Sequence, residues 1–436
     1  MATIIAFFIL KLHFSHILRV PLSAGASCGA APGFGTRKAA MRIGRSQDDV
    51  LPFRFLSTIL PRSVAWCAPV ALALLSFALA GDGLITPAQL APNSLKRFDH
   101  NHLGPLDRSH IAVVINVDDP LSEAIGRLYA RERRIPADQV LRVRLPVGKA
   151  DLAPARFRRL EAELRRHTPA HVQAYALAWQ EPWRVGCQSI TAAVTLGLDT
   201  SACRRTCRAT RLSPYHARGD VLRPWDQLRL RPSMLLAARN IDQARGLISR
   251  GIAADGTAPS GTAYLLSTSD SVRNVRAAGY GAVAAAAGHG FRVRILHGDA
   301  LRGADDVMAY FTGLAVVPEI ASNRYRPGAV ADHLTSLGGQ LSIETGQMSA
   351  LRWLEAGATG SYGTVVEPCN IRAKFPDPGL LLAYYRRGDT LLEAYWRSVA
   401  MPDQGLFIGA PLARPWPARP EVSPGGASDA RPRRAR

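Results

Sequence analysis

Apolar strand patterns alternate with amphipathic helix patterns along most of this chain. The run HIAVVINVDD at 110–119 is continuously apolar and β-branched, which is typical of a parallel strand buried on both faces. Asp119 and Pro120 are a typical N-cap and first residue of a helix, which Pro136 ends. A strand over QVLRVRLP, a helix over 151–168 and a strand over VQAYALAW follow. This alternation predicts an α/β protein with doubly wound, mostly parallel sheets and helices on both faces.

The pattern also predicts how the chain is divided. Residues 181–232 interrupt the alternation and hold three cysteines, so we expect a Cys-rich insertion there. We expect an N-terminal α/β domain at 110–270, which contains this insertion, and a C-terminal α/β domain at 271–414. A polar linker at 81–109 precedes them. A basic tail at 415–436, rich in Pro, Arg, Gly and Ser without periodicity, is predicted to be disordered.

The first 80 residues have the character of a leader. An apolar run at 64–80 follows Arg54 and Arg62 and ends in Ala-Leu-Ala, the small-x-small pattern of a signal-peptidase site. We therefore expect cleavage after Ala80 and a periplasmic or secreted protein. The run has the minimum length for crossing a bilayer, so an uncleaved N-terminal membrane anchor is the alternative. Membrane contact is expected only through this leader.

The charge of the chain does not favour a nucleic acid as partner. The formal net charge is +20, but the arginines are spread over helix faces such as RFRRLEAELRRH, where they alternate with Glu. The sequence contains no basic stripe interleaved with aromatic residues, and no helix-turn-helix or zinc-finger spacing. No cofactor is predicted.

Cys187, Cys203 and Cys207 lie in the predicted insertion, and thiols of exported proteins tend to be oxidised. We expect Cys203 to form a disulfide with Cys207 or with Cys187; a bridge to Cys207 requires a turn, because cysteines at i and i+4 of a helix are too far apart. A zinc site of the three cysteines with His216 is the alternative, although its spacing matches no standard zinc motif. Cys369, just past a predicted strand, is a candidate nucleophile without a histidine close in sequence.

Residues 328–368 predict one strand, helix, strand unit. The first strand breaks at Gly338 and Gly339, a helix at 346–357 ends at Gly357, and ATGSYGTVV forms the second strand. Functional groups of open α/β sheets lie beyond the carboxyl ends of such strands. The candidate residues at these two ends are Asp332, His333, Thr335, Ser336 and Glu367.

These side chains contain the residue types of a hydrolytic site, with His333 as base, Ser336 as nucleophile and Glu367 as acid or base. In an extended strand, however, only His333 with Thr335, or Asp332 with Ser336, would share a face. A structural histidine that is hydrogen-bonded at a strand end is the alternative.

The chain also resembles known proteins. The segments VVINVDDPLSEAIGRLYARERRIP, YFTGL, GQMSALRWLEAGATGSYGTVVEPC, KFPDP and GLFIGAPLARP occur in an order that resembles a family of exported bacterial proteins without a known activity. More distantly, the layout resembles the gingipain-type cysteine peptidases, which have a caspase-like α/β fold. In those enzymes one strand ends in a Tyr-x-Gly-His-Gly-like turn with the catalytic His, and the next strand ends in the nucleophilic Cys.

This resemblance implies a caspase-gingipain-like C-terminal half without the catalytic pair. YFTGL has no His at the first position, and TSLG has no Cys at the second. We therefore expect a non-catalytic relative that binds a peptide or a cell-envelope component. The alternative is a peptidase or esterase with a rebuilt Ser/His or Cys site. The expected binding positions are Thr312, Gly313, Asp332 and Thr335.

Overall fold

The computed structural model describes residues 104–287, 292–342 and 346–418. All of them belong to one compact unit, Gly83–Arg436. The predicted leader, the linker up to residue 103 and the tail from residue 419 lie outside the described residues. Within the described ranges, no helix is both long enough and apolar enough to span a membrane.

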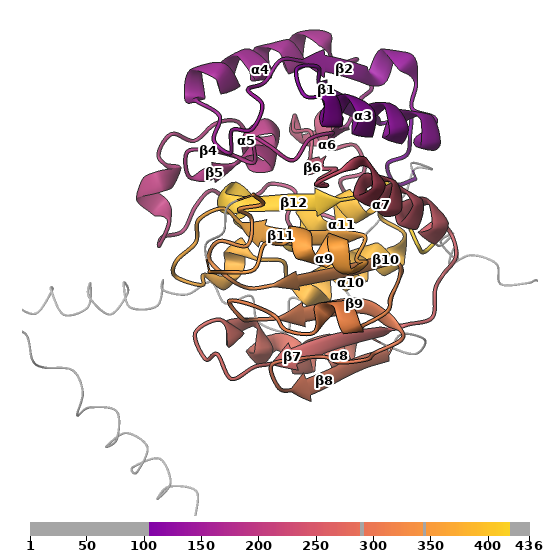
Figure 1. The fold of residues 1–436 in the computed structure, drawn as a ribbon, viewed down its shortest axis with the longest axis vertical. Coiled ribbons are helices and arrows are strands. Elements are labelled where there is room, and N and C mark those ends of the chain that lie inside the picture. Colours follow the sequence, from indigo (N-terminus) through magenta and orange to yellow (C-terminus); the bar gives the residue numbers. More distant parts are fainter. Residues whose placement is uncertain (1–103, 288–291, 343–345, 419–436) are drawn as a thin grey trace, which may run out of the picture. The chain divides into compact units, whose positions relative to one another are not determined.

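Ten strands form one sheet, in the order β2-β1-β3-β6-β12-β11-β10-β9-β7-β8 (Figure 1). Neighbouring strands are parallel except β11 and β12, which pair antiparallel. The sheet therefore consists of two parallel groups that run in opposite directions. The first group contains β1 (Ile111–Asn116), β2 (Val140–Val143), β3 (Ala174–Leu177), β6 (Ser233–Leu235) and β12 (Gly405–Gly409). The second group contains β7 (Thr262–Ser267), β8 (Arg292–His297), β9 (Val307–Thr312), β10 (Tyr325–His333) and β11 (Gly360–Thr364).

The two groups have the same internal order. In each group, the strand at the outer edge of the sheet is the second of its group in chain order, and its inner neighbour is the first. The third, fourth and fifth strands follow toward the middle of the sheet. β7 comes before the domain boundary predicted at residue 270 but belongs to the second group, and β12, from the end of the chain, completes the first. Both predicted domains thus contribute to one α/β sheet, and their boundary does not coincide with the division between the groups.

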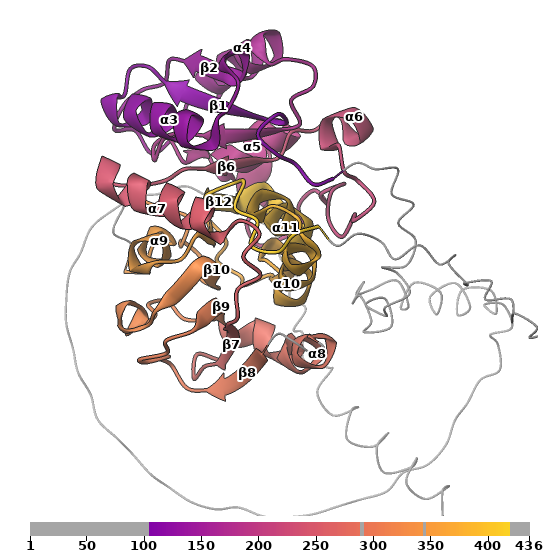
Figure 2. The ribbon, with the colours of Figure 1, turned by 90° about the vertical axis from the view of Figure 1, so that its right-hand side faces the viewer.

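Helices cover both faces of the sheet. Figure 2 shows α3, α7 and α9 in one layer and α8, α10 and α11 in the other. The helices are α3 (Pro120–Arg133), α4 (Pro154–His167), α5 (Ile190–Leu196), α6 (Pro224–Leu228), α7 (Ile241–Ala254), α8 (Tyr280–Ala286), α9 (Leu351–Ala356), α10 (Pro378–Arg387) and α11 (Leu391–Ser398). Short 3-10 helices are η2 (Ala137–Gln139), η3 (Ala202–Arg205), η4 (Asn274–Gly279), η5 (Ile320–Ser322), η6 (Arg372–Lys374) and η7 (Pro402–Gln404).

Local sequence signals explain the first strand and helix. All six residues of β1 are buried, as expected for a strand covered on both faces. Asp119 caps α3 by accepting a hydrogen bond from the backbone N–H of Leu121, and Pro120 is its first residue, where no backbone donor is needed. The predicted start of this helix is confirmed.

The insertion is structured and covalently anchored. It contains a short hairpin, β4 (Arg184–Val185) with β5 (Gln188–Ser189), together with α5, η3 and α6. Cys187 bonds to Cys203, which confirms one of the two predicted pairings. The other pairing is wrong, because Cys207 bonds to Cys369, 162 residues away. The fold brings these two cysteines together, and their spacing in the sequence gave no sign of it.

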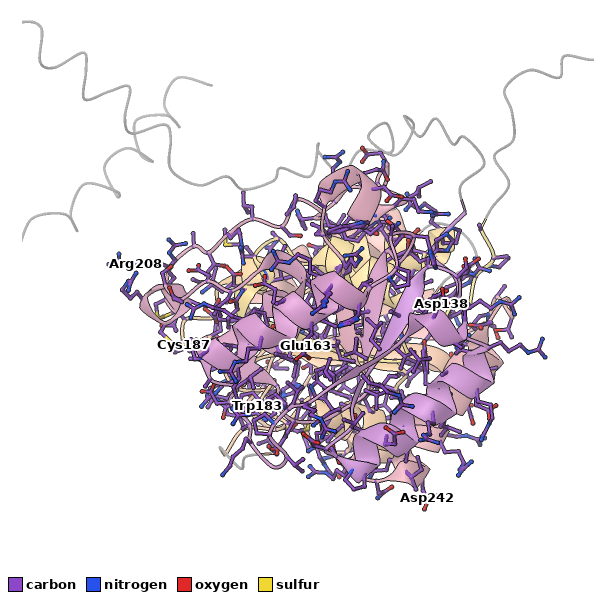
Figure 3. The ribbon with its side chains drawn as sticks, turned by 90° about the horizontal axis from the view of Figure 1, so that it is seen from above. Asp138, Glu163, Trp183, Cys187, Arg208 and Asp242 are labelled. Atoms are coloured by element: carbon purple, nitrogen blue, oxygen red, sulfur yellow. A yellow bond between two sulfur atoms is a disulfide. The ribbon has the colours of Figure 1, made fainter. Side chains whose placement is uncertain are left out.

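These disulfides have two consequences. Cys369 is no free thiol, so it does not act as a nucleophile while the bond is intact, and two disulfides indicate an oxidising compartment. In Figure 3, Cys187 and Arg208 of the insertion lie on one side of the view, and Asp138 and Asp242 lie on the other.

The packed part of the chain extends past the predicted start of the tail. The Pro415 carbonyl accepts a hydrogen bond from the Ala258 N–H at 2.8 Å, and the Trp416 ring packs edge-on against Tyr385 at 5.4 Å. Composition alone does not show that these two residues pack against the body of the fold.

Candidate functional site

The candidate site lies at the carboxyl edge of the second strand group. β7, β9, β10 and β11 are parallel, so the residues that follow them lie along one edge of the sheet. β10, α9 and β11 form the predicted parallel strand, helix, strand unit. α9 begins at Leu351, later than predicted, and is followed by Gly357 at a φ of 121°, a conformation that favours glycine.

His333 is a buried and fully hydrogen-bonded side chain. Its Nδ1 accepts from the indole N–H of Trp353 at 3.0 Å, and its Nε2 donates to the carbonyl of Met348 at 2.9 Å. This pattern requires the neutral ring with its proton on Nε2. Burial lowers the pKa of His333 to about 3. Since both nitrogens are in use and the ring is 1% exposed, these contacts favour a structural histidine over a general base.

The pKa of His333 predicts an acid-sensitive fold. The ring is neutral in the folded chain, with a pKa of about 3, and takes up a proton in the unfolded chain below its ordinary value of 6.5. The unfolded state therefore binds more protons between these values, and the contribution of His333 to stability is lost as the pH falls, by about 1.4 kcal/mol per pH unit.

His333→Gln, which cannot titrate, is expected to be less stable at pH 7 but to depend less on pH below about 6.5. Urea unfolding of both chains from about pH 7 to pH 5 measures the two slopes, and other groups contribute equally to both. Parallel slopes would contradict this assignment.

Asp332 belongs to a buried ion pair. Its carboxylate lies 2.5 Å from Nη1 of Arg276, and both side chains are about 2% exposed or less. Nη2 of Arg276 donates to the carbonyl of Thr312 at 2.7 Å. Burial raises the pKa of Asp332 to about 6, although the charge of Arg276 opposes this shift. Asp332 and Thr312 are thus joined through Arg276 inside the protein.

Arg273 connects polar side chains of the loops after β7 and β10. Its Nη1 lies 2.8 Å from Asp270, and its Nε donates to the Thr335 hydroxyl at 3.1 Å. The Thr335 hydroxyl donates in turn to Gln347 at 2.7 Å. The side chains of Asp270 and Arg273 are 20% and 24% exposed. These two residues, which are not among the residues predicted from the sequence, form a charged pair at the surface of this edge.

Ser336 and Glu367 are close in the fold but do not form a catalytic pair with a histidine. The Ser336 carbonyl accepts from the Glu367 N–H at 2.9 Å, and Ser336 is 9% exposed. The ring nitrogens of His333 are bonded to Trp353 and Met348 instead. In the described ranges, no histidine hydrogen-bonds the Ser336 hydroxyl.

Glu367 is enclosed by the structure. It is fully buried, its carboxylate lies 3.9 Å from Nζ of Lys374, and burial raises its pKa. Lys374 also donates to the carbonyls of Arg205 and Thr206 at 3.0 and 2.6 Å. This carboxylate therefore lies where the insertion is attached and not in an open crevice.

Gly313 makes a close backbone contact. A Cβ at this position would lie 2.0 Å from the carbonyl oxygen of Arg273, so only glycine fits. The Gly313 carbonyl accepts from the Thr268 hydroxyl at 2.7 Å. The loops after β7 and β9 are consequently in direct contact.

Among the described residues, no group of three or more His, Cys, Asp or Glu side chains is placed to hold a metal ion. The three cysteines of the alternative zinc site are in disulfides. Comparisons of the chain with protein-family models, with curated proteins and with solved structures give no match.

Proposed function

We propose that this chain is a non-catalytic binding protein of the periplasm or the cell exterior, and that it binds a peptide or another component of the cell envelope. One observation supports it above all: the residues suited to thiol chemistry at the strand ends are already bonded within the fold. Cys369 is in a disulfide, and both nitrogens of His333 are hydrogen-bonded. A cysteine peptidase needs a free thiolate and a histidine that activates it.

The surface of the same edge suits a peptide. Val272 is 60% exposed and follows β7, and Val316 is 55% exposed and follows β9. The contact between Gly313 and Arg273 brings these two loops together. Asp270 and Arg273 lie close to Val272 in the chain, and water reaches their charged side chains. Exposed apolar side chains beside hydrogen-bonding groups match the side chains and the backbone of a bound peptide.

The proposed location agrees with the cysteine chemistry. Disulfides persist in the periplasm and outside the cell. The apolar run at 64–80 supplies a signal peptide or an anchor for export.

A binding screen tests this function. Peptides selected from a displayed library on the purified chain are expected to bind about tenfold more weakly to Val272→Asp, because a charge replaces an apolar contact. Val147→Asp is the matched control, since Val147 is 50% exposed on the loop after β2. Equal weakening by both variants would argue against this surface.

The hydrolase alternative has its own measurement. Peptide and ester substrates are incubated with the wild-type chain and with Ser336→Ala. We expect no turnover that depends on Ser336. Turnover that Ser336→Ala abolishes would replace the binding function with a rebuilt serine site.

A further inference from the structure

A cavity of about 320 Å³ lies in the first strand group, between α4, α5 and the residues that follow α6. Its lining includes the apolar side chains of Leu164, Leu196 and Leu230 and the rings of Tyr175 and Trp225. Its volume is at the lower end of the range for sites of small organic ligands, roughly 300 to 1,000 Å³. The cavity shares no residue with the strand-end site.

Arg231 is the buried charge of this cavity. It is 7% exposed, its guanidinium lies 3.5 Å from the centre of the Trp225 ring, and its Nε donates to the Val172 carbonyl at 2.8 Å. No carboxylate in the described part of the chain forms an ion pair with it. Asp226, on the neighbouring helix, accepts from Gln173 instead. Burial lowers the pKa of Arg231, although its contacts with Tyr175 and the charge of Asp226 oppose this shift.

Two further arginines line the same cavity. Arg229 is exposed and lies 5.7 Å from the Trp225 ring, and the side chain of Arg165 on α4 is 71% exposed. Glu161 is the one carboxylate in the lining, and it lies 3.9 Å from Arg165. The three lining arginines therefore outnumber the two nearby carboxylates, Glu161 in the lining and Asp226 beside Arg231, which leaves a surplus of positive charge.

We propose that this cavity binds a small organic anion, with its carboxylate or phosphate group against Arg231 and its apolar or aromatic body against Trp225 and the leucines. A guanidinium presents parallel N–H donors that fit the oxygens of either group. A bound anion would form the direct ion pair that Arg231 does not make with any described residue. This site does not depend on the function proposed above, because different residues form it.

Calorimetric titration of the full chain with three related probes tests the proposal. N-acetyl-phenylalanine carries a carboxylate, phenyl phosphate carries a phosphate, and N-acetyl-phenylalanine amide is neutral. We expect at least one acid to bind tenfold or more tightly than the amide, with an affinity that falls as salt is added. The tighter acid identifies the preferred group. Equal binding of acids and amide, or no binding of any probe, would overturn the proposal.

Variants locate the binding to the cavity. Arg165→Gln and Arg229→Gln change exposed residues, so the fold is retained, and each is expected to weaken the bound acid about fivefold. Arg166→Gln is the matched control, because Arg166 is an exposed neighbour on α4 outside the cavity lining, and it should change nothing.

Arg231→Gln is expected to weaken binding by about 100-fold, as hydrogen bonds to a charged group are lost in a buried place. If this variant does not fold, the two exposed variants decide the question. Effects of Arg165→Gln and Arg229→Gln no larger than that of Arg166→Gln would refute the site.

Discussion

Removing the disulfide between Cys207 and Cys369 is expected to lower the free energy of unfolding by about 5 kcal/mol. The bond closes a long loop, since its two cysteines are 162 residues apart. In the chain-entropy account, a crosslink stabilises by restricting the denatured chain, and the effect grows with the logarithm of the loop length. Urea unfolding of Cys207→Ala/Cys369→Ala, compared with the wild-type chain without reductant, measures the loss.

The second disulfide provides the control. Cys187 and Cys203 are 16 residues apart, so the same account gives about 3 kcal/mol for Cys187→Ala/Cys203→Ala. The Cys187–Cys203 bond lies within the insertion, whereas the Cys207–Cys369 bond joins the insertion to the residues after β11. Equal losses would contradict the entropic account.

The sequence predicted those elements whose causes are local. Asp119 and Pro120 begin α3 as predicted. Signals of the same local kind begin two later helices: Thr390 and Glu393 form a capping box at the start of α11, and Asp377 caps α10. The sequence around β12 contains no comparable local signal that predicts its place in the sheet. This strand pairs antiparallel with β11 and parallel with β6, where Ile408 lies opposite Leu235. Pairing between residues so far apart is decided by packing of the whole chain.

The candidate site shows the same limit. The prediction that the polar residues after β9, β10 and β11 share one edge is consistent with the parallel pairing of these strands. The direction of each side chain depends on residues elsewhere in the chain. The indole N–H of Trp353, 20 residues after His333, donates to the Nδ1 of His333 and fixes the orientation of its ring. Arg273 and Arg276 were missed. Their spacing of three, which places side chains on one side of a 3-10 turn, was the available signal.

The buried pair of Arg276 and Asp332 is expected to be strongly coupled. Asp332→Asn leaves the charge of Arg276 inside the protein without a counter-charge, which should cost about 3 to 5 kcal/mol. Arg276→Met instead leaves the Asp332 carboxylate inside the protein without a counter-charge. The double variant buries neither charge and should be more stable than the sum of the two single losses predicts. Urea unfolding of the four chains at pH 7 gives the coupling energy.

An exposed ion pair is the control for this cycle. The side chains of Arg131 and Glu132 are 70% and 43% exposed, and water screens their charges. We expect a coupling below about 1 kcal/mol for Arg131→Ala/Glu132→Ala. Additive losses for Arg276→Met and Asp332→Asn, within about 0.5 kcal/mol, would mean that the buried contact contributes no more than this exposed one.

The pH dependence of Arg276→Met separates an orphaned charge from lost packing. In the wild-type chain the pKa of Asp332 is raised to about 6 from its ordinary value of 3.8, because burial favours the protonated acid. The contribution of this raised pKa to the free energy of unfolding is fully present below about pH 4 and is lost as the pH rises to about 6. Without Arg276 the pKa of Asp332 should rise further, since the charge that opposes burial is gone. Arg276→Met should therefore be less destabilising at pH 5, where Asp332 can be protonated, than at pH 7. Equal losses at both pH values would assign the cost to lost packing of the arginine side chain.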